Sequence, residues 1–304
     1  MSPLLLVGAG LALLFFGGDL LVRGAMALAA RLGVPTALIG LTVVGFGTSM
    51  PELVVSVDAA LRGTPDIALG NVVGSNTANV LLIVGLAALV WPIRTAGLSL
   101  GRDLVAMLAA SVALLPLFWT GGVSRWAGAA LVAALALYLA QSIRTARADP
   151  ETTPIATASL PRAGLLTLAG LAMLIVGARA LVSGAVDIAR DFGVSEAFIG
   201  LTVVAVGTSL PELATSLVAA LRRQSAIALG NVVGSNLFNV LGILGVTALI
   251  APVPVAPRFL TIDLPVMAGA GLALALLMQR PSIGRMAGAA LLAAYAAYVV
   301  FAVS

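Results

Sequence analysis

The sequence predicts an all-α polytopic membrane protein in which ten transmembrane helices form two inverted five-helix repeats, with broken helices at the midplane. Its composition is the first reason: 61% of the residues are hydrophobic, 9% are charged and the mean hydropathy is +1.15, whereas soluble domains carry about 25% charged residues. The second reason is a series of apolar segments long enough to cross a hydrocarbon core about 30 Å thick. The third is an internal repeat at an offset of 160 residues.

Ten spans and one polar linker account for the chain. The first span is expected to stay in place, because no basic segment precedes it as in a signal peptide. Residues 146–161 are polar and contain several prolines, which predicts a cytoplasmic linker between a first five-helix repeat, 1–145, and a second, 162–304. In chain order the spans are expected at 3–30, 36–61, 66–91, 102–120, 124–144, 163–190, 196–221, 226–250, 259–279 and 283–302.

The internal repeat predicts how the two halves enter the membrane. Gly40–Leu81 aligns without a gap on Gly200–Leu241, and 29 of the 42 positions are identical. Each half holds five spans, an odd number, so the second half must enter the membrane in the opposite sense to the first. Inverted repeats are the architecture of many secondary transporters, whose substrate sites lie near the midplane between the repeats.

The charged residues favour one orientation and exclude several functions. All sixteen basic residues are arginines, and of those near span ends ten fall on one side and four on the other. The richer side is cytoplasmic by the positive-inside rule, which places both termini outside. Because the arginines are scattered singly, we expect them to anchor the protein in the lipid bilayer, with no nucleic acid and no protein partner.

The absence of cysteine and histidine limits the covalent bonds and metal ligands that the protein can form. It excludes disulfides and thiolate or imidazole metal ligands. No nucleophile with a neighbouring base and no phosphate-binding loop is visible in the sequence. We therefore expect that the protein is not an enzyme and that it uses no cofactor.

The motif Gly-Thr-Ser-x-Pro-Glu occurs once in each half. Pro51 cannot donate to the carbonyl of Gly47, and Pro211 cannot donate to that of Gly207, so each helix is expected to break with a free carbonyl oxygen. Broken helices at membrane depth are tolerated where they line a cavity, and their exposed carbonyls suit cations.

Each proline is followed by a glutamate, Glu52 or Glu212, in the middle of an apolar run. A charge at the centre of a span costs about 2.5–3.5 kcal/mol on insertion scales. A carboxylate paired with arginine is the simple alternative, but no basic residue lies near either glutamate in its span. We therefore expect both to bind a cation.

A second duplicated motif, Gly-Asn-x-x-Gly-Ser-Asn with a further asparagine, predicts a helix face of uncharged oxygens. Asn71, Ser75 and Asn79 are spaced so that they lie on one side of a helix. Such residues are also common contacts between membrane helices, a role that we assign to Asn76 and Asn236. The residues of the repeated face are Asn231, Ser235 and Asn239.

Together the motifs supply carboxylate, hydroxyl, amide and backbone oxygens, without nitrogen or sulfur ligands. That set suits hard cations such as Ca²⁺ and Na⁺, which we expect as partners. Asp19 and Arg23 are spaced as an ion pair within the first span. Asp58 has no acidic counterpart, since Val218 occupies the equivalent position, and we do not assign it to the site.

At these two motifs the sequence resembles the cation/calcium exchanger family, in particular the prokaryotic sodium/calcium exchangers with ten spans and two alpha-repeats. The resemblance extends over nearly the whole chain in topology. It implies that Glu52 and Glu212 bind Ca²⁺, and that the second, third, seventh and eighth spans surround the ions. The Na⁺ sites that it implies are completed by the hydroxyls of Thr48, Ser49, Ser75, Thr208, Ser209 and Ser235 and the carbonyls of Gly45 and Ala205.

Two departures from the family pattern bear on ion choice. Asn79 and Asn239 stand where some relatives carry an acid, and the potassium-requiring branch typically carries Asp there, which argues against potassium dependence. Gly74 and Gly234 stand where the calcium/proton branch usually has Glu, which favours sodium. We therefore expect an antiporter that exchanges Ca²⁺ for Na⁺ by alternating access. The alternatives are a Ca²⁺/H⁺ antiporter, a cation channel and a structural membrane protein without transport.

Overall fold

The protein is a bundle of membrane helices in the computed structural model, which describes residues 2–148, 158–192 and 205–303. Seven of the described helices are long and apolar enough to cross a membrane, and Thr36–Thr48 with Met50–Leu61 forms an eighth candidate, bent by 44°. The chain is therefore an integral membrane protein. The count of ten spans and the inverted arrangement of the halves stay predictions.

The elements of the first half follow the expected spans closely. The second span is divided by a π-helix, η1, and a break, and the third contains the π-helix η2. In order they are α1 (Pro3–Leu32), α2 (Thr36–Ile39), η1 (Gly40–Val44), α3 (Gly45–Thr48), α4 (Met50–Leu61), α5 (Pro65–Ala78), η2 (Asn79–Val84), α6 (Gly85–Val90), β1 (Ile93–Arg94), α7 (Gly101–Trp119), β2 (Gly122–Val123) and α8 (Arg125–Ala148).

The second half repeats this order where it is described. The beginning of the predicted span 196–221 and most of the predicted linker lie outside the described residues. The elements are α9 (Leu160–Asp191), α11 (Ala205–Thr208), α12 (Leu210–Leu221), α13 (Ser225–Leu237), η4 (Phe238–Ile243), α14 (Leu244–Ile250), β3 (Val253–Pro254), η5 (Phe259–Asp263), α15 (Leu264–Leu277), β4 (Ser282–Ile283) and α16 (Arg285–Val303).

Helix ends follow the local sequence. Ser2 caps α1 by accepting a hydrogen bond from the N–H of Leu5, and Pro3 occupies the first helical position, where its missing N–H costs no intrahelical bond. Gly33 ends the helix in the left-handed region with φ of 64°, a conformation that glycine adopts without steric cost.

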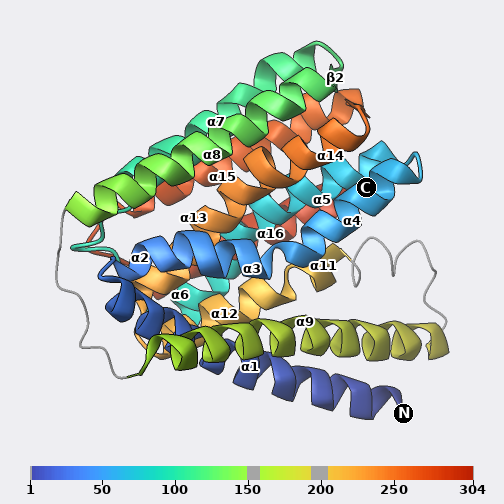
Figure 1. The fold of residues 1–304 in the computed structure, drawn as a ribbon. Helices are drawn as coiled ribbons and strands as arrows, with labels where there is room; N and C mark the ends of the chain where they lie inside the picture. Colours follow the sequence, from blue (N-terminus) through green and yellow to red (C-terminus); the bar gives the residue numbers. More distant parts are fainter. Residues whose placement is uncertain (1, 149–157, 193–204, 304) are drawn as a thin grey trace.

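The helices α1 and α9 lie side by side along the lower edge of the molecule in Figure 1. Glycines bring their backbones together: a Cβ on Gly10 would lie 2.6 Å from the N of Leu181, and one on Gly170 would lie 2.5 Å from the N of Leu21. Small residues allow close approach in a membrane, where dispersion contacts drive helix association. The larger apolar core lies in the other part of the bundle and includes α5, α7, α13 and α15.

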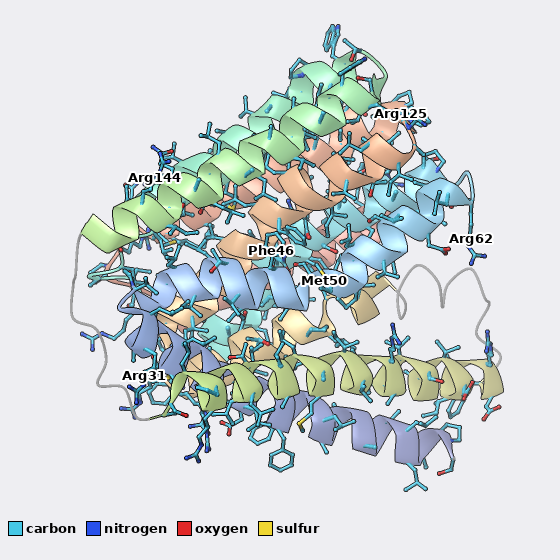
Figure 2. The ribbon with its side chains drawn as sticks, viewed as in Figure 1. Arg31, Phe46, Met50, Arg62, Arg125 and Arg144 are labelled. Atoms are coloured by element: carbon cyan, nitrogen blue, oxygen red, sulfur yellow. The ribbon has the colours of Figure 1, made fainter. Side chains whose placement is uncertain are left out.

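Short strands and arginines mark the two ends of the bundle. The antiparallel pairs β1–β4 and β2–β3 each join a strand from one half of the chain to one from the other. Figure 2 shows Arg31 and Arg144 at one end, and Arg62 and Arg125 at the opposite end. The sequence assigns these two pairs to opposite faces of the membrane. Which face is cytoplasmic stays a prediction.

Candidate cation site

Two broken helices form the walls of the candidate site. The first breaks at Ser49, with φ and ψ of −85° and 8°, and the second breaks at Ser209, with −85° and 6°. Pro51 and Pro211 each take the second position of the helix that follows, where proline is tolerated. The predicted breaks are therefore present in both halves.

The glutamates after these prolines are buried and meet at one place. Glu52 and Glu212 are each 1% exposed, and both lie in the first turn of their helices, where the helix dipole favours a negative charge. Ser49 Oγ donates to Glu212 Oε1 at 2.8 Å, and Ser209 Oγ donates to Glu52 Oε1 at 3.3 Å. The two halves thus contribute jointly to a single site.

Threonine hydroxyls make the same crossed contacts. Thr48 Oγ1 donates to Asn231 Oδ1 at 3.1 Å, and Thr208 Oγ1 donates to Asn71 Oδ1 at 3.4 Å. Asn71 Nδ2 also donates to the backbone carbonyl of Glu52 at 2.9 Å, and Asn231 Nδ2 donates to that of Glu212 at 3.3 Å. Thr48, Thr208 and the two asparagines therefore fix the broken helices against α5 and α13.

Four asparagines cross between α5 with η2 and α13 with η4. Asn79 Nδ2 donates to Asn236 Oδ1, and Asn239 Nδ2 donates to Asn76 Oδ1, both at 2.9 Å. The Nδ2 of Asn76 also donates to the carbonyl of Asn236 at 3.2 Å. The side chains of Asn76 and Asn236 form hydrogen bonds between helices, which agrees with the structural role expected for these two residues.

Several oxygens of this centre lack a hydrogen-bond partner. Among the described residues these are Oε2 of Glu52 and Glu212 and Oδ1 of Asn79 and Asn239, each buried from solvent. Burying an unsatisfied acceptor costs about 1–3 kcal/mol, and more for a charged group. Carboxylate and amide oxygens are the ligands that Ca²⁺ takes, so a bound hard cation would give such oxygens the partner that they lack. The hydroxyls of Thr215 and Thr247 are also buried without a hydrogen-bond partner.

The carbonyl of Gly45 lies where the first helix breaks and accepts several hydrogen bonds. The donors are Ser235 Oγ at 3.3 Å, Thr48 Oγ1 at 3.4 Å and the N–H of Ser49 at 3.2 Å. The expected carbonyl and the expected serine of the other half are thus in contact.

The remaining expected residues lie in the same part of the molecule. Ser75, on α5, accepts a hydrogen bond of 3.3 Å from Ser209, which itself bonds Glu52. Ala205 is the first residue of α11, the short helix that ends at Thr208.

Two serines of the site escaped the sequence analysis. Ser56 Oγ accepts from Asn71 Nδ2 at 2.8 Å, and Ser216 Oγ accepts from Asn231 Nδ2 at 2.9 Å. Both lie one turn after a glutamate, and they are separated by the repeat offset of 160 residues. Ser56 and Ser216 could therefore have been identified from their equivalent positions in the internal repeat.

A family model described as sodium/calcium exchanger protein matches residues 2–144 and 163–304. The chain belongs to the sodium/calcium exchanger family. Among relatives of this exchanger, the putative antiporter CaxA of Alkalimonas amylolytica is 38% identical over 302 residues, 95% of each chain. The sodium/calcium exchanger MaX1 of Methanosarcina acetivorans is 32% identical, over 96% of this chain and 95% of its own.

A bacterial relative and a solved structure support the same membership. The inner membrane protein YrbG of Escherichia coli is 40% identical to this exchanger, over 94% of this chain and 92% of its own. A structure of the sodium-calcium exchanger NCX_Mj, soaked with Na⁺ and Ca²⁺, matches with a TM-score of 0.86 at 32% identity and covers 99% of both chains. The exchanger is therefore a cation antiporter of the calcium-transporting class.

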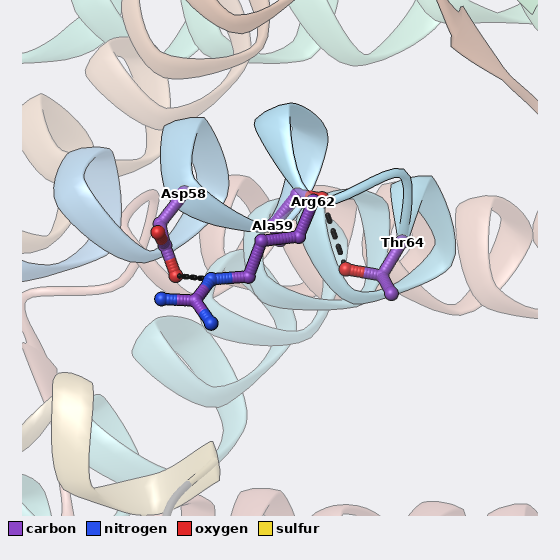
Figure 3. A network of polar contacts seen from close by, with 4 residues as sticks. All are labelled: Asp58, Ala59, Arg62 and Thr64. Atoms are coloured by element: carbon purple, nitrogen blue, oxygen red, sulfur yellow. Dashed lines mark hydrogen bonds and ion pairs between the residues drawn. The ribbon is translucent and has the colours of Figure 1, made fainter.

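Other charges of the exchanger stand apart from the site. Asp58 pairs with Arg62 of its own helix at 2.7 Å, and its side chain is 56% exposed; Figure 3 shows this pair at the end of α4. Asp19 pairs with Arg23 at 2.9 Å, as its spacing predicts, and also with Arg222 of α12. No group of three or more acidic residues that could hold a metal ion occurs in the part of the chain that the structure describes.

Proposed function

We propose that this exchanger moves Ca²⁺ out of a prokaryotic cell in exchange for Na⁺, at one midplane site that opens alternately to each side of the inner membrane. The observation that carries the proposal is the group of buried, unpartnered oxygens on Glu52, Glu212, Asn79 and Asn239. Two carboxylates balance the charge of one Ca²⁺. The same oxygens can instead surround Na⁺, so Ca²⁺ and Na⁺ compete for one site. Because the site carries either ion but not both, transport of one ion is coupled to transport of the other.

The proposed ligands are the residues that the sequence singled out. The glutamates bind Ca²⁺ directly, and the neutral oxygens around them complete the Na⁺ positions. These neutral ligands are Thr48, Thr208, Ser49, Ser209, Ser75, Ser235, Asn79, Asn239 and the carbonyls of Gly45 and Ala205.

Sodium is the proposed counter-ion for two reasons. Gly74 and Gly234 leave the site without the additional glutamates typical of proton-coupled relatives. The hydroxyls around the carboxylates add neutral oxygens that a cation can use and a proton does not need. The name of MaX1 states sodium/calcium exchange for that protein, which supports the same coupling here.

The test is ⁴⁵Ca²⁺ uptake into proteoliposomes under one imposed gradient at a time. An outward Na⁺ gradient should drive uptake, whereas an H⁺ or K⁺ gradient without Na⁺ should not. Uptake driven by a pH gradient alone would replace the proposal with Ca²⁺/H⁺ antiport, and Ca²⁺ flux without countertransport would indicate a channel.

Substitutions locate the site within the same assay. Glu52→Gln and Glu212→Gln should each abolish Na⁺-driven uptake, because each removes one of the two charges. Asp58→Asn is the matched control, since Asp58 lies on the same helix as Glu52 and is exposed. Normal uptake in both glutamine variants would overturn the assignment.

A further inference from the structure

Two buried acids outside the cation site form a second repeat-related pair. Asp103 is 8% exposed and Asp263 is 4% exposed, and they are separated by the repeat offset of 160 residues. Both lie within candidate membrane spans, where an ionisable residue is costly and is usually functional. The transport site does not use either of them.

Each acid is bound by a tyrosine that obeys the same offset. Tyr138 Oη donates to Asp103 Oδ1 at 2.7 Å, and Tyr298 Oη donates to Asp263 Oδ1 at 2.9 Å. The chain has three tyrosines, and the third, Tyr295, has no counterpart because leucine occupies position 135.

An arginine contacts one of the two acids directly. Arg258 Nε lies 3.3 Å from Asp263 Oδ2. Arg102, next to Asp103 in the chain, donates instead to Thr145 and Ser142 of α8.

The tyrosine contacts join the two helices of each hairpin. α7 and α8 are connected by the turn at 120–124, and Asp103 and Tyr138 meet near the other end of this hairpin. Asp263 and Tyr298 meet in the same way, far from the turn at 278–284. The helices α15 and α16 line an open apolar cavity of about 770 Å³ with small residues such as Gly269 and Ala294. In the second hairpin the Tyr298–Asp263 hydrogen bond joins the two helices at the end away from the turn. In the first, the Tyr138–Asp103 bond does so together with the bonds from Arg102 to Thr145 and Ser142.

The hairpins hold the π-helices that carry the central asparagines. α8 packs on η4 and α16 packs on η2. In the first hairpin, Leu135 lies one turn before Tyr138, and its Cδ2 would be 3.1 Å from a Cβ on Gly242 of η4. On the facing helix, Met107 lies one turn after Asp103, and its sulfur accepts from Asn236 Nδ2 at 3.5 Å.

We propose that Asp103, Tyr138, Asp263 and Tyr298 are positioning residues for ion binding. Each Asp–Tyr hydrogen bond holds one hairpin against the π-helix that it covers, and thereby fixes Asn239 or Asn79 at the cation site. The part of the inference that concerns Ca²⁺ affinity rests on the proposed function.

The test compares Tyr138→Phe and Tyr298→Phe with the control Tyr295→Phe, by amide hydrogen exchange and by Ca²⁺ titration calorimetry. Tyr138→Phe should accelerate exchange in 238–243 and leave 79–84 unchanged, and Tyr298→Phe should do the reverse. A general loss of stability would accelerate both segments together. The Ca²⁺ dissociation constant should rise about tenfold in each variant, the lower end of the range for residues that orient metal ligands. The control should match the wild type in both measurements.

Conservative variants separate the hydrogen bond from the charge. Asp103→Asn and Asp263→Asn keep an oxygen that accepts from tyrosine, so they should lose less Ca²⁺ affinity than the phenylalanine variants. Larger losses in the asparagine variants would overturn a positioning role, because the charge would then be what matters. Unchanged affinity in the phenylalanine variants of a protein that binds Ca²⁺ would also overturn it. A wild type that binds no Ca²⁺ but shows the expected segment-specific exchange would overturn the proposed function and leave the positioning contacts supported.

Discussion

Ser49 in the first half of the chain donates a 2.8 Å hydrogen bond to Glu212 in the second. Ser209 and Glu52 repeat the contact in the opposite direction. Each carboxylate therefore depends on a hydroxyl from the other half, and neither half holds a complete site.

Removing one of these hydroxyls should weaken ion binding. Ser49→Ala leaves Glu212 Oε1 without its donor and takes one proposed Na⁺ ligand from the site. Hydrogen bonds to charged groups contribute about 1.5–3 kcal/mol, so we expect at least a tenfold loss of Na⁺ affinity, and a similar loss for Ser209→Ala. Calorimetric titration measures it. Ser124→Ala, at an exposed turn, is the control, and equal affinities in all three variants would contradict the prediction.

Bound Ca²⁺ should raise the thermal stability of the protein. A ligand that binds only the folded state stabilises it by about 2.7 kcal/mol at one hundred times its dissociation constant. The melting temperature in detergent should therefore rise with Ca²⁺ and fall back when a chelator is added. Glu52→Gln and Glu212→Gln should melt at the same temperature with and without Ca²⁺. A shift of wild-type size in both variants would show that the ion binds elsewhere.

Much of this arrangement could be predicted from the sequence, because hydrophobicity and proline act locally. The expected second span, 36–61, has the ends that the structure gives it, with the break at Ser49 two residues before Pro51. The contacts between α1 and α9 could not be predicted from the residues alone. Glycines that allow close approach occur in several spans, and only the three-dimensional structure shows that Gly10 faces Gly177 of α9.

For the candidate site, the sequence singles out residues but does not predict their contacts. Duplication singled out the glutamates, but the crossed partners of Asn79 and Asn239 depend on how the halves meet. The π-helices that contain these two residues were also missed. They require a shifted hydrogen-bond ladder that no residue in η2 or η4 dictates, and such helices recur at functional sites.

The asparagine crossing should be important for stability. Asn76→Ala removes the acceptor of Asn239 Nδ2 and leaves that buried donor unsatisfied, at a cost of about 1–3 kcal/mol. Asn236→Ala should do the same to Asn79. Because the four side chains form one network, the double variant should lose less stability than the two single losses added together. Unfolding in a denaturing detergent measures this, and simple additivity would show that the two contacts are independent.

The close packing of α1 on α9 should tolerate no side chain at Gly10. A Cβ there would lie 2.6 Å from the N of Leu181 and 2.8 Å from the carbonyl oxygen of Gly177, so Gly10→Val must push the two helices apart. Gly8 of the same helix is exposed and has no atom of the described residues within 4 Å of its Cβ position. We expect Gly10→Val to lower the yield of folded protein and its melting temperature, and Gly8→Val to leave both unchanged. Equal behaviour of the two variants in size-exclusion chromatography and thermal melts would contradict this packing.

Two of the acidic residues that pair with arginines outside the site, Asp58 and Asp19, should differ in their contribution to stability. Asp58 is 56% exposed and pairs only within its own helix, with Arg62, so Asp58→Asn should change the free energy of unfolding by less than about 1 kcal/mol. Asp19 is 15% exposed and is shared by Arg23 and Arg222, which links α1 to α12. Asp19→Asn leaves two arginines without that charge in a less hydrated place, and we expect a loss of about 1–3 kcal/mol. Raising the salt concentration should reduce the effect at Asp58 more than the effect at Asp19, because buried pairs are screened less. If Asp58→Asn proved the more destabilising of the two, the prediction that the Asp19–Arg222 contact stabilises the protein would be wrong.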